Sequence, residues 1–129
     1  MRPACARADI PGLTHSPFEM PKLQKPPKTY QEFMRRFPRV GKAWELTGEA
    51  GREGPLDVKC ARLVKLALSI GTMREGAVHA AVRKALAVGV TRAEIDQVIT
   101  LAAGSIGFPA TVAVYSWIEE LVVDEARRR

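Results

Sequence analysis

The amino-acid sequence predicts an all-α protein, built as a single-domain bundle of about six helices. Beyond the first 26 residues, apolar residues recur at intervals of three and four, which is the spacing of an amphipathic helix. Glycine, proline and capping residues separate these runs. No stretch of useful length alternates apolar and polar residues as a half-buried strand does. A length of 129 residues, 47% of them hydrophobic, suits one domain.

The N-terminal part divides into an arm and the first helices. Residues 1–26 contain five prolines and no periodicity, so we expect an extended arm there and a helical domain over residues 27–129. The first helix is predicted to begin near Lys28. Pro38 interrupts its pattern, and a second short helix follows at about Val40–Glu49.

The third and fourth helices are predicted over about Asp57–Ile70 and Met73–Val88. A glycine follows each of them, Gly71 and Gly89, where a helix commonly ends in a conformation that glycine adopts easily. Apolar residues cover much of the circumference of the third helix. Such a wide apolar surface indicates burial on more than one side, within a bundle or at a subunit interface.

Capping signals define the last two helices. Thr91 and Glu94 have the spacing of a capping box, with Thr91 as the N-cap of a fifth helix that ends near Gly104. Pro109 suits the first turn of a sixth helix, which runs to about Ala126.

Charge and hydropathy exclude two classes of partner. The net charge is +6, but the excess of basic residues sits mostly in the N-terminal part and in the run Arg127–Arg129. No basic stripe interleaved with aromatic residues is present, so we expect no nucleic-acid partner. No apolar run approaches the roughly 20 residues that cross a bilayer, so no membrane partner is expected. The N-terminus lacks the apolar core of a secretory signal, which predicts a cytoplasmic location.

The two cysteines do not form a recognisable motif. Cys5 and Cys60 are 55 residues apart, which matches no metal or redox spacing, and no metal site is expected. Cys60 falls on an apolar helical face, where we expect a small core residue. A disulfide between the two is not expected in a reducing compartment.

One acid and one histidine share the core stripe of the fourth helix. Glu75 and His79 precede Val82 and Leu86 at helical spacing, so both polar groups are expected to face the core. A carboxylate four residues before an imidazole can fix its tautomer and raise its basicity, which suits proton transfer. A structural pair that caps the helix or bridges subunits would show the same pattern, and both interpretations stay open. Trp117, on the last helix, is a core or interface aromatic that could also line a pocket.

The order of the motifs resembles a known family. A glycine-valine-threonine turn and capping box at Gly89–Ile95, the segment Gly107–Ala110 at the start of the last helix, and the Glu75–His79 pair carry this resemblance. With these motifs the chain resembles the carboxymuconolactone decarboxylase / alkylhydroperoxidase D-like family over about residues 28–123. The resemblance implies an all-helical fold that assembles as a homotrimer or homohexamer.

The resemblance also bears on chemistry. The peroxidase branch of the family uses two cysteines and a histidine, which would fall near Arg74, Ala77 and Ala81, and none of these matches. The decarboxylase branch needs no redox cysteine and no metal, so no cofactor is expected. For that branch, the resemblance implies a proton donor or acceptor acting on a small organic acid or lactone. Arg74 or Arg83 would then hold the substrate carboxylate.

The leading hypothesis is therefore a cofactor-independent lyase or related enzyme, with Glu75 and His79 as its acid–base pair. Trp117, Arg74 and Arg83 are the expected substrate-binding residues. A non-catalytic or ligand-binding member of the same fold is the main alternative, so the sequence leaves open whether the protein is an enzyme. A thiol-dependent alkylhydroperoxidase is the least favoured, because peroxide reduction needs a reactive thiolate and a resolving thiol.

Overall fold

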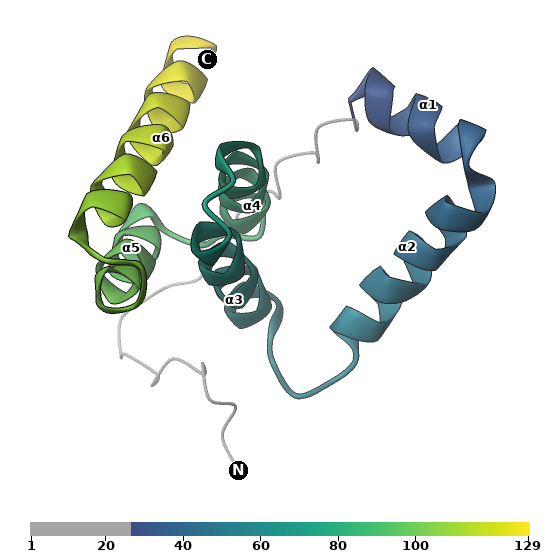
Figure 1. Ribbon diagram of the computed structural model, residues 1–129, viewed down its shortest axis with the longest axis horizontal. Helices are drawn as coiled ribbons and strands as arrows, with labels where there is room; N and C mark the ends of the chain where they lie inside the picture. The colour runs from purple at the N-terminus through teal and green to yellow at the C-terminus, as the bar shows by residue number, and fades with distance from the viewer. Residues whose placement is uncertain (1–26) are drawn as a thin grey trace.

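The computed structural model describes residues 27–129, and these residues form six α-helices and no β-strand (Figure 1). The all-α fold expected from the sequence is confirmed. None of the six helices is both long and apolar enough to cross a membrane. The arm expected over residues 1–26 lies outside the described residues. In chain order the helices are α1 (Lys28–Arg36), α2 (Pro38–Arg52), α3 (Val58–Gly71), α4 (Glu75–Ala87), α5 (Arg92–Ile106) and α6 (Phe108–Arg127).

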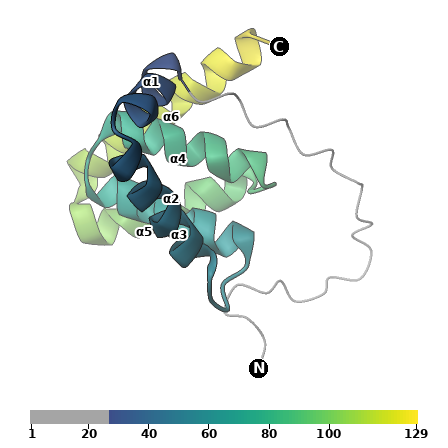
Figure 2. The same cartoon turned by 90° about the vertical axis from the view of Figure 1, so that its right-hand side faces the viewer.

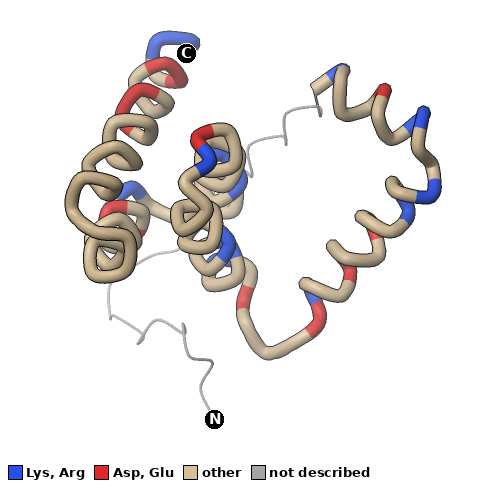
Figure 3. Tube along the Cα trace, viewed as in Figure 1, with Lys and Arg blue, Asp and Glu red and all other residues tan. Residues whose placement is uncertain are grey.

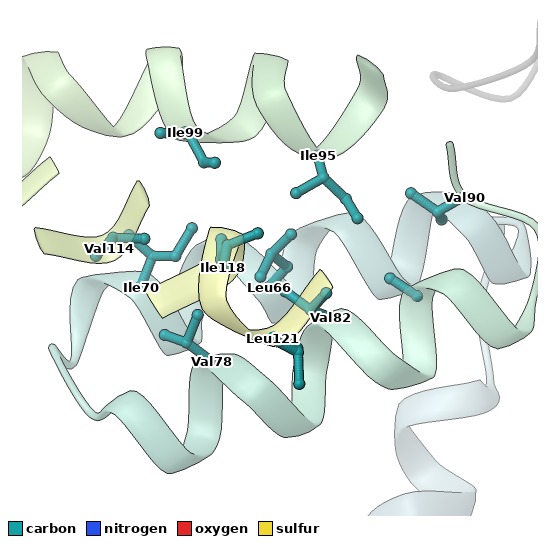
Figure 4. Close-up of a cluster of buried hydrophobic side chains, with 11 residues drawn as sticks. Leu66, Ile70, Val78, Val82, Val90, Ile95, Ile99, Val114, Ile118 and Leu121 are labelled. Carbon is teal, nitrogen blue, oxygen red and sulfur yellow. The ribbon is translucent and has the colours of Figure 1, made fainter. Parts of the chain in front are cut away.

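The last four helices form the bundle. They contact one another in a closed ring, in which α3 packs on α4 and α5, and α6 packs on α5 and α4. Each neighbouring pair therefore defines one seam. The apolar side chains inside the ring form one cluster, to which all four helices contribute (Figure 4). Its fully buried large members are Leu66, Ile70, Val78, Val82, Ile95, Val114 and Ile118.

Local interactions begin the bundle helices close to where the sequence predicted, but the expected end of the third helix at Gly71 is wrong: Gly71 lies within α3, and the positive φ of the following turn, 53°, falls on Met73. The side chain of Asp57 accepts a hydrogen bond from the backbone N–H of Cys60 at 2.7 Å and caps α3. Thr91 and Glu94 form the expected capping box at the start of α5. Gly89, in the turn before it, has a φ of 86°, a conformation that a residue with a Cβ rarely adopts.

Helices α1 and α2 form a separate hairpin. In Figure 1 they lie apart from the bundle, and in Figure 2 they lie in front of it. Their main packing contacts are with each other. At the elbow between them, a Cβ on Gly41 would lie 3.0 Å from the terminal carbon of Met34, so glycine lets the two helices approach closely. Gly41 is the only buried residue of either helix.

Several expected boundaries and faces differ from the structure. Helix α1 ends at Arg36, just before Pro38 as expected, but α2 begins at Pro38 and not at Val40, because a proline fits the first turn of a helix. The apolar circumference of α3 is divided between two environments. Leu66 faces the core, whereas Leu68 is 65% exposed.

Cys60 is buried, as expected, but it is disulfide-bonded. The expectation that this thiol has no disulfide partner is therefore wrong for this structure. Sequence spacing could not find the bond, since it depends on how distant segments approach one another. Cys5, the other cysteine of the chain, lies outside the described residues.

The core can be tested with two substitutions on α5. Replacing the fully buried Ile95 with alanine leaves a cavity, so Ile95→Ala should lower the free energy of unfolding by about 2–5 kcal/mol. Leu101 is 68% exposed, and the matched Leu101→Ala variant should change it by less than about 0.5 kcal/mol. Urea denaturation followed by circular dichroism measures both. Equal losses would contradict the assignment of the core face.

Candidate functional site

His79 lies on α4 and contacts the backbone of α6. Its Nε2 atom is 3.1 Å from the carbonyl oxygen of Trp117. A carbonyl oxygen only accepts hydrogen bonds, so Nε2 carries the hydrogen and donates it. In the neutral imidazole, the lone pair is then on Nδ1. The backbone of α6 thus selects one tautomer of His79, whose side chain is 23% exposed at the α4–α6 seam.

Glu75 lies one turn before His79 and is the first residue of α4. Its Oε1 atom is 3.9 Å from the same Nε2 atom, an ion-pair distance that is too long for a hydrogen bond. The expectation that Glu75 faces the core is wrong, because its side chain is 52% exposed. The carbonyl of Trp117, and not Glu75, holds the imidazole. The charge of Glu75 at the helix N-terminus is favourable for the helix dipole.

The three other residues expected at the site differ in their contacts. Trp117 is half-buried, and its carbonyl gives it a direct contact with His79. Arg83, one turn after His79, forms an ion pair with Glu125 of α6, with 3.5 Å between Nε and Oε1. Arg74 is the exposed N-cap residue of α4 and has no ion pair with any residue in the described range 27–129.

Two concavities of the described bundle lie away from this pair. An apolar groove of about 540 Å³ follows the α3–α5 seam and is lined by residues such as Leu63, Val98 and Leu101. A smaller hollow of about 410 Å³ lies on the α5–α6 seam. Neither includes Glu75, His79, Arg74, Arg83 or Trp117. The pair therefore lies outside both concavities, at the partly exposed α4–α6 seam.

A polar cluster in the smaller hollow was not anticipated from the sequence. Arg92 forms ion pairs with Asp96 of its own helix and with Glu119 of α6. Desolvation opposes the charge of Arg92, but the hydrogen bonds to the two carboxylates outweigh it and raise the pKa of its guanidinium. The spacing of four between Arg92 and Asp96 was the only available signal for this cluster. Because both carboxylates are already paired, the cluster ties α5 to α6.

A second cluster contains only cations. Burial lowers the pKa of Lys84, and the charges of Arg62 and Lys65 lower it further. These residues belong to α3 and α4, and none of the three forms an ion pair with another described residue. The α3–α4 seam is therefore a site of like-charge repulsion.

No group of three histidine, cysteine, aspartate or glutamate side chains within residues 27–129 is placed to hold a metal ion. The chemistry available at the α4–α6 seam in the described residues is that of an imidazole, a carboxylate and two arginines.

The repulsion at Lys84 predicts a stabilising substitution. Lys84→Gln should raise the free energy of unfolding at pH 7 by a few tenths of a kcal/mol, about the size of other surface charge effects. The pKa of Lys84 is lowered in the folded protein, so its charge destabilises the fold in full at pH values below that pKa. The gain in stability should shrink as pH rises through that pKa towards 10.5, the ordinary pKa of a lysine, because folded Lys84 then loses its proton.

Thermal unfolding across this pH range checks the Lys84 prediction, with Arg129→Gln at the exposed C-terminus as the control. A Lys84→Gln variant that is less stable than the parent at pH 7 would show that this lysine has a favourable partner.

Comparison with known protein families agrees with the all-α fold. The model of the carboxymuconolactone decarboxylase family matches residues 38–120, which include all of helices α2–α5 and more than half of α6. No curated protein and no solved structure matches the chain significantly. The matched region contains Glu75, His79, Arg74, Arg83 and Trp117. Since the family model covers well over half of the sequence, this chain belongs to the carboxymuconolactone decarboxylase family.

Proposed function

We propose that this protein is a cofactor-independent lyase, or a related enzyme, that acts on a small organic acid or lactone by acid–base chemistry. The observation that carries the proposal is the fixed tautomer of His79. Its Nε2–H is held by the Trp117 carbonyl, which leaves the lone pair of the neutral ring on Nδ1. A general base needs such a defined lone pair and a limited set of orientations.

The proposed step moves one proton. A carboxylate substrate loses CO₂, and the electron pair of the broken carbon–carbon bond passes into a conjugated carbonyl or lactone of the same molecule. Nδ1 of neutral His79 takes up a proton from water, and the resulting imidazolium gives this proton to the carbon, so that the imidazole returns to its neutral form. Glu75, 3.9 Å from Nε2, supports the transient positive charge electrostatically.

Two arginines are available to hold the substrate carboxylate. Arg83 is already paired with Glu125, so its use by a substrate would compete with that ion pair. Arg74 directly precedes Glu75 and has no ion pair with another described residue. We therefore assign Arg74 the main carboxylate contact, through charge-assisted hydrogen bonds. Arg83 and the half-buried Trp117 are proposed to border the same site.

The open seam supports one alternative, a non-catalytic or ligand-binding protein. Neither of the concavities described above holds the pair, and an enzyme needs to surround its substrate. A homotrimer or homohexamer, as expected from the sequence, would close the seam from outside. The oligomer and the cytoplasmic location stay predictions. A thiol-dependent alkylhydroperoxidase is disfavoured, because α4 carries no cysteine and Cys60, on α3, is disulfide-bonded.

The first experiment is a thermal-shift screen with small carboxylic acids and lactones, followed by product analysis and CO₂ release for each hit. A ligand that binds the folded state raises the midpoint of unfolding. We expect hits among conjugated lactone acids. Hits that bind without being consumed would support the ligand-binding alternative.

Substitutions then test the acid–base pair on any compound that is turned over. His79→Ala should lower turnover by about a hundredfold or more, the usual loss for a general acid–base group. Glu75→Gln should lower it less, because Glu75 acts through charge and does not hold the imidazole.

The matched control for the pair is Glu53→Gln, in the exposed loop between α2 and α3, which should keep full turnover. Circular dichroism and thermal unfolding verify that each variant is folded. Full turnover per folded His79→Ala subunit would remove the catalytic assignment and leave the pair a structural role.

A further inference from the structure

The α1–α2 hairpin has an apolar surface without a partner in the described chain. An isolated helix of nine residues, such as α1, is marginally stable in water and needs tertiary packing. The hairpin buries only Gly41, and its main contacts are internal. The apolar side chains of the hairpin are therefore free to contact a partner outside the described residues.

The exposed apolar side chains of the hairpin are large and aligned. Tyr30, Phe33 and Phe37 follow one stripe, with exposures of 40, 47 and 43%. The rings of Phe33 and Phe37 contact each other with their centroids 5.0 Å apart. On α2, Trp44 is 60% exposed. Aromatic residues clustered in this way are typical of the core of a protein interface.

The hairpin is also basic. Between residues 28 and 52 it carries six lysines or arginines and three glutamates (Figure 3). Arg35, Arg39 and Lys42 are exposed near its elbow, and none of them forms an ion pair with another residue of the described range. A partner surface with apolar side chains and unpaired carboxylates would match this pattern.

The outer face of α6 has the complementary pattern. We define it by Val112, Tyr115, Glu120, Val123 and Asp124, all of which are exposed. The carboxylates of Glu119 and Glu125 are paired with Arg92 and Arg83. Those of Glu120 and Asp124 have no ion pair among the described residues, although they lie one helical turn apart.

We propose that the α1–α2 hairpin of one copy of this chain packs on the outer face of α6 of a second copy. The aromatic stripe would cover Val112, Tyr115 and Val123, and the basic elbow would meet Glu120 and Asp124. The contact would bury the exposed apolar side chains of both surfaces and would pair the basic residues of one with the carboxylates of the other. The outer face of α6 adjoins the α4–α6 seam, so the partner's hairpin lies next to His79. This inference does not depend on the proposed chemistry.

Cross-linking within the full-length protein tests the contact. A photoreactive benzoylphenylalanine replaces Trp44, and copies labelled with ¹⁴N and ¹⁵N are mixed, dissociated and reassembled before irradiation. We expect mixed-isotope cross-links between position 44 and peptides from residues 108–127. Cross-links within one isotope only would place the hairpin on its own chain. Mixed-isotope cross-links to α3 or α5 would place it in the other groove, and a stable monomer without cross-links would show that no second copy binds. Each of these three results overturns the proposal.

Variants measured by sedimentation velocity give an independent test. Trp44→Glu should raise the dissociation constant of the assembly at least tenfold, because it inserts a charge into the aromatic patch. The protein should then sediment as a smaller species. Leu68→Glu is the matched control, since Leu68 is equally exposed on α3 but lies outside the proposed contact. Its sedimentation should stay that of the parent protein. An equal shift of both variants to a smaller species would contradict the assignment.

Charge reversal tests the orientation of the contact. The double variant Glu120→Lys/Asp124→Lys should weaken assembly, and so should Arg35→Glu/Arg39→Glu. Mixing the two variants should restore it, because opposite charges then face each other in every contact between unlike copies. Failure of the mixture to assemble better than either variant alone would contradict the charge complementarity.

Discussion

The packing of α4 against α6 is the constraint on which the candidate site depends. Val78 and Val82 of α4 and Val114 and Ile118 of α6 are fully buried in one cluster, which holds the two helices in register. At that register the imidazole of His79 reaches the carbonyl of Trp117, 38 residues further along the chain. Interior packing is close and tolerates little displacement, so an apolar contact fixes the geometry of a polar one.

The fold was largely predictable from the sequence because its signals are local. Asp57, Thr91 and Glu94 cap helices through bonds to residues three positions away, and the buried positions of α5 and α6 follow helical spacing. The start of α2 was placed at Val40 and not at Pro38, because a proline that ends one helical pattern can also begin the next helix. Half-buried Trp117 was expected on the inward side of its helix, and it lies there.

The site was less predictable because its partners come from distant parts of the chain. Helical spacing placed Glu75 and His79 one turn apart, but it could not show that a backbone carbonyl of another helix accepts from the imidazole. The pairing of Arg83 with Glu125 and of Arg92 with Glu119 joins helices in the same way. The wide apolar surfaces were visible in the sequence. Which of them stay open, on α1, α2 and the outer face of α6, required coordinates.

The tautomer of His79 tests most directly whether its Nε2–H donates to the carbonyl of Trp117. Long-range ¹⁵N–¹H NMR correlation of histidine-labelled protein distinguishes a protonated Nε2 from a protonated Nδ1, and His79→Gln identifies the signals. We predict that the neutral imidazole of His79 carries its hydrogen on Nε2. We also expect a bound organic acid to perturb the Nδ1 resonance. Because the carbonyl of Trp117 can only accept, a neutral His79 protonated on Nδ1, or averaged between the two tautomers, would contradict this hydrogen bond.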